Sequence, residues 1–173
     1  MDITLLSPSL DHKKSALIFK NEFNNYDFSV AGLCGLEKTD NYEDWLKILE
    51  QRKTKETLPQ DKVPTFVYFA IRKKDNKIIG IVAIRPNLNE FLTKYAGHIG
   101  FIVSPKERQK GYGKIITKLA IEKCKEFKID EIIITCKKTN TISARCILAC
   151  GGKLIEEIPW IDKIQIQQRY IIK

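Results

Sequence analysis

Blocks of apolar and polar residues predict strands and helices in turn along the chain. Residues 2–7 form a short apolar run, and two longer runs, 65–72 (TFVYFAIR) and 77–85 (KIIGIVAIR), have the β-branched and aromatic content of strands. The four residues between the longer runs, Lys73-Lys74-Asp75-Asn76, include the Asp and Asn that favour a turn. The two runs are therefore expected to form a β-hairpin.

Two helices are predicted ahead of this hairpin. The first lies between Leu10 and Phe23, and its apolar face is expected to consist of Leu10, Leu17, Ile18 and Phe23. The second is expected from about Tyr42 to Thr57, with Trp45, Leu46, Ile48 and Leu49 at its apolar positions. The proline-containing stretch 58–64 ends it, and the polar segment 25–40 between the helices is expected to be a loop.

The second half of the chain alternates strand and helix more regularly. Strands are predicted over 97–103, 131–136, 153–158 and 163–172, and helices over 87–95 and 142–149. Between the first two of these strands lies an amphipathic helix with Ile115, Ile116, Leu119, Ala120, Ile121 and Cys124 on its inward face. The nearly all-apolar run 131–136 is typical of a strand buried on both faces in a parallel pair. In the last strand Ile164 and Ile166 alternate with Gln165 and Gln167, a pattern suited to pairing at a sheet edge, so a homodimer is one expectation.

Hairpin strands first and strand-helix-strand units later indicate an α/β fold built on a mixed sheet. The chain has 173 residues, of which 43% are hydrophobic and 29% charged, and it contains no repeat, low-complexity tract or Gly/Ser-rich linker. This is the size and composition of one soluble globular domain, which is expected to span residues 1–173.

The chain is basic, with 30 Lys and Arg against 21 Asp and Glu and a net charge of +9. Such a charge suits nucleic acid, an anionic lipid or a small anionic ligand, and composition alone does not choose among them. Only 6 of the cations are arginine, the residue that reads bases through paired hydrogen bonds, which disfavours sequence-specific DNA binding. A basic nucleic-acid-binding module is therefore the weaker alternative, and no nucleic-acid partner is expected.

Cysteine and histidine usage predicts neither a metal site nor a disulfide framework. The five cysteines include no CxxC pair, and the chain has two histidines, His12 and His98. The first residues lack a basic leader followed by an apolar core, and no run of about 18 apolar residues occurs. A cytoplasmic protein without a membrane partner is expected.

The segment from Val103 to Lys114 carries the most specific chemical signal, because it joins a predicted strand to the start of an amphipathic helix. The first amides of a helix and its positive end bind phosphate, and Gly111 and Gly113 let a ligand approach the backbone closely. Further positive charge comes from Arg108, Lys110 and Lys114. The alternative for this segment is a tight turn whose lysines are merely solvated.

Spacing excludes two other phosphate loops. A Walker A pattern would need Gly where Arg108 stands and Ser or Thr where Ile115 stands, and a dinucleotide fingerprint would need Gly in place of Ile116. Neither pattern fits this turn.

The run Arg108-Gln109-Lys110-Gly111-Tyr112-Gly113 resembles the Arg/Gln-x-x-Gly-x-Gly/Ala signature of the GNAT superfamily of acyl-CoA N-acyltransferases. Downstream, residues 140–152 resemble the Asn-x-x-Ala/Ser motif of that superfamily with its following helix and glycine. The stretches ETLP, LNEFL and GHIGFIVSPKERQKGYG are similar to a subgroup of predicted acetyltransferases. The resemblance implies a central mixed, mostly antiparallel sheet flanked by helices, and an N-acetyltransferase that uses acetyl-CoA as co-substrate without a metal.

The same resemblance implies which residues bind acetyl-CoA. Amides of the turn would hold the pyrophosphate, a strand would pair with the pantetheine arm, and an N–H near Ile102 or Val103 would polarise the thioester carbonyl. The implied set is Phe101, Ile102, Val103, Arg108, Gln109, Lys110, Gly111, Tyr112, Gly113, Lys114, Asn140 and Ser143.

The catalytic acid and base are less well defined. Many members of the superfamily carry a Tyr seven residues after the Asn, but this chain has Ile147 there, so Tyr112 or Tyr95 or water would protonate the leaving thiolate. His98 is the first candidate for the base, with a core histidine as the alternative, and Glu90 is the second, with an exposed helix carboxylate as the alternative.

The acceptor is expected to be a primary amine of a small molecule or protein. Its pocket is expected from the loop 25–40, the segment 56–64 and the last two strands, which carry no recognisable substrate signature. Because Ile147 replaces the usual Tyr, a catalytically silent acyl-CoA sensor of the same fold is the main alternative function.

Overall fold

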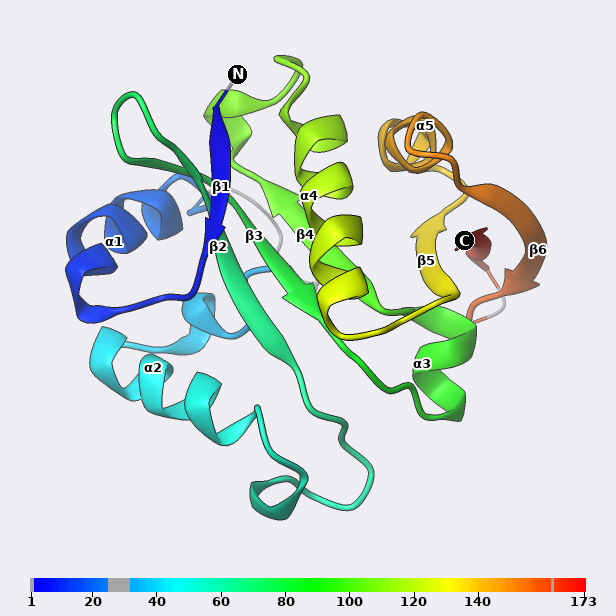
Figure 1. The fold of residues 1–173 in the computed structure, drawn as a ribbon, viewed down its shortest axis with the longest axis horizontal. Helices are drawn as coiled ribbons and strands as arrows, with labels where there is room; N and C mark the ends of the chain where they lie inside the picture. Colours follow the sequence, from blue (N-terminus) through cyan, green and yellow to red (C-terminus); the bar gives the residue numbers. More distant parts are fainter. Residues whose placement is uncertain (1, 25–31, 163) are drawn as a thin grey trace.

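A seven-stranded sheet runs through the part of the chain that the computed structural model describes, residues 2–24, 32–162 and 164–173 (Figure 1). Its strands are β1 (Ile3–Leu6), β2 (Phe66–Arg72), β3 (Lys77–Ile84), β4 (Ile99–Val103), β5 (Ile132–Lys137), β6 (Lys153–Pro159) and β7 (Ile166–Ile172). Their order is β1-β2-β3-β4-β5-β7-β6, and all neighbours are antiparallel except β4 and β5. The mixed, mostly antiparallel sheet and the β2–β3 hairpin expected from the sequence are confirmed.

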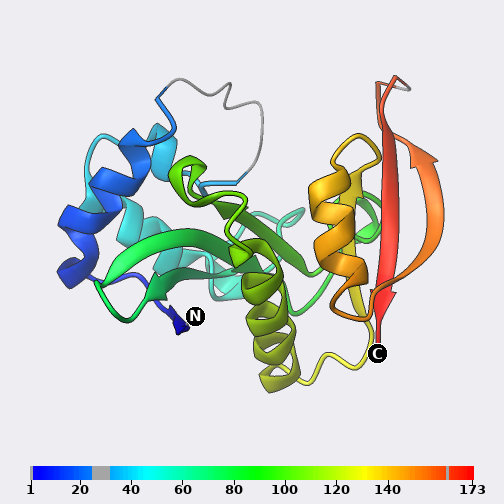
Figure 2. The same ribbon diagram turned by 90° about the horizontal axis from the view of Figure 1, so that it is seen from above.

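Helices cover both faces of this sheet (Figure 2). On one face lie α1 (Lys13–Asn21) and α2 (Tyr42–Gln51), and on the other lies α4 (Tyr112–Glu126). Two shorter helices, α3 (Glu90–Tyr95) and α5 (Thr141–Leu148), contact β7 and β5 respectively. Single 3₁₀ turns are formed by residues 10–12, 36–38, 55–57 and 105–107.

Each face of the sheet has its own core. Phe19 of α1 and Trp45 of α2 pack with Phe69 on one side, whereas Ile116 of α4 packs with Val82 on the other. The central strand β3 contributes to both cores and is buried from residue 78 to residue 84. This double burial explains why its sequence is a nearly continuous apolar run.

The first helix buries a face that matches the expected one only at Phe23. Leu10, Leu17 and Ile18 are 62%, 37% and 54% exposed, while Ala16 and Phe19 are buried together with Phe23. The 3₁₀ turn that precedes the helix puts its residues out of phase with the α-helical spacing that follows. The buried residues are three and four positions apart, so they share one face of the helix.

The second helix ends at Gln51 rather than at Thr57. The next residue, Arg52, donates its guanidinium to the Cys34 carbonyl at 2.8 Å, and its own carbonyl accepts from Thr65 N–H at 2.8 Å. These contacts with the loop before α2 and the chain before β2 stop the helix. A separate 3₁₀ turn then covers residues 55–57.

The last strand is not at the edge of the sheet, which corrects the expectation from its sequence. β7 lies between β5 and β6, and β6 is the edge strand at this end of the sheet. The phase of the alternation is also opposite to the expected one, because Gln167 is buried and donates to the Tyr95 carbonyl and to Thr135 Oγ1, both at 3.0 Å. The buried side-chain amide of Gln167 is hydrogen-bonded, but a pattern based on hydropathy alone assigns a glutamine to the solvent-facing side of a strand.

Candidate functional site

The two central strands β4 and β5 separate soon after they meet. Their parallel register contains one residue pair, Ile99 with Ile134, and an isolated bridge joins Gly97 to Ile134 just before it. Gly97 has a φ of +71°, and a Cβ there would lie 2.3 Å from the Ile133 carbonyl oxygen, so only glycine allows this close approach. Beyond Ile99, β4 keeps β3 as a neighbour but has no paired strand on its other side among the described residues.

His98 holds the two strands together where they meet. Its N–H donates to the Ile133 carbonyl at 2.7 Å, and its Nδ1 accepts from the Ile133 N–H at 2.9 Å. Because Nδ1 is an acceptor, the proton of the neutral imidazole is on Nε2. Burial lowers the pKa of His98, the backbone hydrogen bond with Ile133 opposes this shift, and the charge of Arg85 adds to it.

The register of β4 determines which of its amides face the open side. Ser104 N–H donates to the Ile79 carbonyl at 2.8 Å, so Ser104 belongs to the row of residues that bond to β3. Hydrogen-bonded positions alternate in an antiparallel ladder, which puts Ile102 in that row and turns the N–H groups of Phe101 and Val103 outward. Of the two amides considered for the thioester carbonyl, only that of Val103 faces the open edge.

The turn after β4 presents a row of unbonded amides. Gln109 and Gly111 have φ values of +63° and +80°, and α4 starts at Tyr112. The N–H groups of residues 109–112 donate to no other described residue. Unpaired amides at the positive end of a helix form an anion-binding concavity.

A network of ion pairs around Glu107 supports this turn. Glu107 is buried and accepts from Lys77 at 2.8 Å, from Lys110 at 3.0 Å and from Arg72 at 3.1 Å. Burial by itself would raise the pKa of Glu107, but hydrogen bonds from Lys77 and Lys110 and the charge of Arg72 outweigh it and lower the pKa to about 2. Arg72 also donates to the Tyr112 hydroxyl at 2.8 Å, so the network reaches the first residue of α4.

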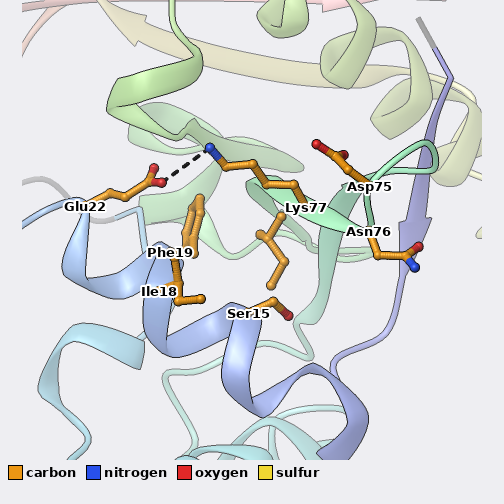
Figure 3. Close-up of a pocket in the computed structure, with 8 residues that line it drawn as sticks. Ser15, Ile18, Phe19, Glu22, Asp75, Asn76 and Lys77 are labelled. Carbon is orange, nitrogen blue, oxygen red and sulfur yellow. Dashed lines mark ion pairs between the residues drawn. The ribbon is translucent and has the colours of Figure 1, made fainter.

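The same network continues to α1. Lys77 lies 3.5 Å from the carboxylate of Glu22, which also accepts a hydrogen bond from the buried hydroxyl of Ser104. Figure 3 shows the Glu22 and Lys77 side chains pointing toward each other across a pocket of about 330 Å³. Charged side chains thereby connect the end of β4 and α1 with the turn between β4 and α4, residues 104–111, which we call the phosphate turn.

The second motif places its residues at the start of α5. Asn140 is the N-cap of this helix, and its Oδ1 accepts from Ser143 N–H at 3.1 Å. On the following turns, Cys146 lies 3.0 Å from the position of a Cβ on Gly113, so α5 packs closely against the start of α4. Ile147 is fully buried in the core on the α4 side of the sheet.

The remaining candidates for acid and base already have other partners. Glu90 is 85% exposed at its side chain and forms an ion pair with Lys94 at 2.8 Å. Tyr112 is buried, and its hydroxyl accepts from Arg72. The ring of Tyr95 packs at 5.0 Å, centroid to centroid, from the ring of Trp160.

A groove of about 1050 Å³ lies on the opposite side of β4 from α4. Its floor contains Ala83 and Gly100, which are paired in β3 and β4. Its walls come from residues 32–38, 58–65 and 89–92, with the side chains of Arg52 and Arg85 at its base. Residues 32–38 and 58–64 belong to segments predicted for the acceptor pocket, residues 25–31 of that prediction lie outside the described residues, and the last two strands do not line the groove.

Sequence reasoning missed the residues that act across long separations. Arg72, Lys77 and Glu22 support the turn, and Arg52 and Arg85 line the groove, but none of them belongs to a motif. The sequence did offer one signal for Arg72 and Arg85. Each arginine stands at the end of a buried strand of the β2–β3 hairpin, where a charged side chain needs a partner from another segment. Among the described residues, no three His, Cys, Asp or Glu side chains gather as they would around a metal ion.

A mixed sheet that opens on one side of a strand, followed by a turn of free amides and a helix N-terminus, defines the class of acyl-CoA-binding transferases. The sequence agrees, since the model of the acetyltransferase (GNAT) family matches residues 30–151, and the chain belongs to this family. Its co-substrate is accordingly acetyl-CoA, and the free amides of the turn provide a fitting site for the diphosphate of that molecule.

Solved structures with the same fold include several acetyltransferases. The microcin C7 self-immunity acetyltransferase MccE, solved with acetyl-CoA and AMP, is 20% identical, with a TM-score of 0.67 over 99% of this chain and 92% of that one. A GNAT-family acetyltransferase from Bacillus anthracis is 16% identical, with a TM-score of 0.66 over 99% and 95% of the two chains. A chimera of spermidine N-acetyltransferase SpeG from Vibrio cholerae and hSSAT is 11% identical, with a TM-score of 0.66 over 99% and 95%. No curated protein sequence gives a significant match.

Proposed function

We propose that this protein transfers the acetyl group of acetyl-CoA to the amine of a small molecule or a protein, by direct attack of the amine. The observation that carries the proposal is the continuity of the open edge of β4 with the free amides of residues 109–112. One extended ligand with a diphosphate at one end and an amide-containing arm at the other would satisfy both sets of groups.

The residues of this chain have separate tasks in holding acetyl-CoA. The amides of residues 109–112 and the N-terminus of α4 would bind the diphosphate, with Arg108 and Lys114 adding positive charge. The outward N–H and C=O groups of Phe101 and Val103 would pair with the pantetheine arm. Asn140 and Ser143, at the start of α5, would contact the ligand from the β5 side of the gap between β4 and β5.

Acetyl-CoA supplies the acetyl group as a thioester, which an uncharged amine can attack without a covalent enzyme intermediate. The outward N–H of Val103 is placed to donate to the carbonyl oxygen that gains negative charge. The new C–N bond replaces the C–S bond, the amine loses one proton and the departing sulfur gains one. We assign both proton transfers to water in the groove, because His98, Glu90 and Tyr112 are each bonded to another group.

His98 has a positioning role in this proposal. Its bonds to Ile133 fix the point at which β4 and β5 separate, and its neutral imidazole has Nδ1 occupied. The rate should then rise with pH according to the pKa of the acceptor amine itself, and two acceptors of different amine pKa should give profiles displaced from each other.

The acceptor would enter through the groove on the α1–α2 side, because Gly100 at its floor directly precedes Phe101 on β4. The amine and the thioester would then approach the same strand from opposite faces of the sheet. A small or extended amine fits such an open groove better than a folded protein surface does.

Calorimetric titration with acetyl-CoA and release of free CoA thiol over an amine library would test the proposal. Binding in the micromolar range is expected, together with thiol release that depends on one or more of the amines. Gly111→Val should weaken acetyl-CoA binding because φ is +80° there, while Gly151→Val, at a φ of +90° outside the turn and with nothing within 4 Å of a Cβ, should not. Binding of acetyl-CoA without thiol release from any amine would instead favour a sensor, and absence of binding at millimolar acetyl-CoA would overturn both.

Two finer expectations belong with this proposal. A homodimer would form through β6, the edge strand, whose Leu154 and Ile155 are 46% and 48% exposed, and sedimentation analysis of the Ile155→Lys variant would test it. A cytoplasmic location stays a prediction from the sequence. No helix in the described ranges is long and apolar enough to cross a membrane.

A further inference from the structure

The groove beside β4 has a chemical character that bears on the acceptor. Its basic lining residues are Lys38, Arg52, Lys62 and Arg85, and its acidic ones are Glu37 and Asp61. The inference drawn here rests on the proposed function, since it concerns which amine enters this groove.

Arg85 lines the groove, and no carboxylate of the described residues forms an ion pair with it. It follows the last residue of β3, and its Nη1 donates to the Gly97 carbonyl at 3.2 Å. Its terminal nitrogens lie 3.6 and 3.7 Å from the position of a Cβ on Gly100, so the guanidinium is in van der Waals range of the backbone of β4. Burial lowers the pKa of Arg85, and the nearby Cys34 thiol opposes this shift.

A second arginine faces the same space. Arg52 donates to the Cys34 carbonyl at 2.8 Å, and Trp45 Nε1 donates to the same oxygen at 3.2 Å. Cys34 has a φ of +57°, a left-handed conformation that is uncommon outside glycine, and Gly35 follows it at +93°. Burial raises the pKa of the Cys34 thiol to about 11 against the charges of Arg85 and Arg52, so both cations act on one point of the groove.

These two arginines differ from the other half-buried arginines. Arg72 pairs with Asp75 and Glu107, and Arg169 pairs with Glu156, whereas no described carboxylate forms an ion pair with Arg52 or Arg85. The acidic residues of the groove have other contacts. Glu37 accepts from Gly35 N–H at 3.1 Å, and Asp61 pairs with Lys62 at 3.1 Å.

A buried guanidinium with only carbonyl partners is an incomplete arrangement. Its planar fork has five N–H donors, and carboxylate or phosphate oxygens are the groups that match it best. Two guanidinium groups that line one groove and form no ion pair with a described carboxylate are suited to bind an anion of a ligand.

We propose that the acceptor amine also carries an anionic oxygen group, a carboxylate or a phosphate, and that Arg85 and Arg52 bind this group. The amine end of the same molecule then reaches β4 at Gly100 and Phe101. Acceptors with a second amine in place of the anion bring a positive charge to the two arginines and bind poorly.

Matched acceptor pairs test this in the wild-type protein. Glycine, β-alanine and 4-aminobutyrate are compared with their carboxamides, and phosphoethanolamine is compared with ethanolamine, by CoA thiol release at fixed acetyl-CoA. At least one anionic member should exceed its neutral partner in kcat/KM by tenfold or more. The carboxylate and phosphate arms show which anion the groove prefers.

Variants connect the preference to the arginines. Arg85→Gln should raise the KM for the preferred anionic amine at least tenfold and leave the KM for acetyl-CoA unchanged, and Arg52→Gln should have a smaller effect of the same kind. Arg85→Lys keeps the positive charge but loses the planar, bidentate donor group. It should therefore restore the KM of a phosphate-bearing amine more than that of a carboxylate-bearing amine. Lys14→Gln removes the same charge from an exposed site on α1 outside the groove and should change neither KM.

A binding experiment makes the inference independent of turnover. N-Acetylated forms of the anionic probes are titrated calorimetrically into the wild type and Arg85→Gln in the presence of CoA, and only the wild type should bind them. Equal use of anionic and neutral amines, or equal binding by both proteins, overturns the inference while the proposed acetyl transfer still stands. Failure of the wild type to bind acetyl-CoA would overturn the proposed function itself.

Discussion

His98 and Ile133 form two hydrogen bonds with each other, one from the His98 N–H to the Ile133 carbonyl at 2.7 Å and one from the Ile133 N–H to His98 Nδ1 at 2.9 Å. An imidazole thus replaces the backbone carbonyl that would otherwise accept the Ile133 N–H. The two strands stay joined at this point and separate immediately after it, so the histidine fixes where the gap between β4 and β5 begins.

Replacing His98 should therefore affect stability more than proton transfer. His98→Leu leaves the Ile133 N–H without an acceptor and should lower the free energy of unfolding by about 2 kcal/mol. His98→Asn has an oxygen near the position of Nδ1 and should recover most of that loss. Urea unfolding of the three proteins measures the difference. A kcat/KM profile of His98→Asn that loses its rise with pH would contradict the positioning role.

The low pKa of His98 adds a pH dependence to the same measurement. The folded protein prefers the neutral imidazole, so its stabilisation is complete above the unfolded pKa of about 6.5 and is lost as pH falls below it toward the folded pKa. Wild-type stability should decrease more than that of His98→Asn between about pH 7.5 and about pH 5.5. If the free energy of unfolding changed equally with pH in the two proteins, the imidazole would be equally protonated in the folded and unfolded states.

Glu107 links three cations beneath the phosphate turn, and Glu107→Gln should loosen that turn. The variant should lose about 2 kcal/mol of stability near neutral pH, because it removes the charge that Lys77, Lys110 and Arg72 share. The wild-type carboxylate stabilises fully above its unfolded pKa of 4.5, and this contribution disappears as pH falls through about 2. The free energies of unfolding of the two proteins, measured at a series of acidic pH values, should converge as the pH falls. At neutral pH, acetyl-CoA should bind less tightly to the variant.

Gly97 and Gly151 offer a matched pair of glycines with positive φ. A Cβ on Gly97 would lie 2.3 Å from the Ile133 carbonyl oxygen, whereas a Cβ on Gly151 would meet nothing within 4 Å. Gly151→Ala should cost about 1 kcal/mol from the backbone conformation alone, and Gly97→Ala should cost several times as much. Thermal unfolding measures both, and similar losses would mean that β4 and β5 can move apart at this point without penalty.

Ile147 occupies the position at which many superfamily members have a tyrosine. Its side chain is fully buried, and a Cβ on Gly152 would lie 2.5 Å from its Cγ2, so the side chain is tightly packed against Gly152. Ile147→Tyr should destabilise the protein by about 1–3 kcal/mol through overpacking and should not raise kcat, while Ile147→Val should cost about 1 kcal/mol. Calorimetric melting and CoA release test both, and a faster, equally stable Ile147→Tyr variant would contradict the packing argument.

Local patterns were sufficient to predict much of the fold. The hairpin of β2 and β3 and the inward face of α4 follow from short-range alternation, helical spacing and a turn of four residues. The phosphate turn is equally local, since its glycines and cations lie within one segment. What the pattern did not predict was the insertion of β7 between β5 and β6, because a buried Gln167 satisfied by Tyr95 and Thr135 looks like a surface residue.

The site depends more on contacts between distant segments than the fold does. The bond from Ser104 to Glu22 joins residues 82 positions apart, and the role of His98 depends on Ile133, 35 positions away. A histidine in a promising segment suggested a base, but its function as an acceptor is set by the strand beside it. Neither relationship leaves a spacing signal in one sequence.

Among the described residues, β4 and β5 share one register pair, so hydrogen bonding divides the sheet into two leaves, β1 to β4 and β5 to β7. A ligand bonded to Phe101 and Val103 from within the gap would complete backbone pairing that the chain alone leaves unfinished. The fully bonded sheet is then a property of the complex, and slowed exchange of the β4 amide protons becomes a direct record of occupancy.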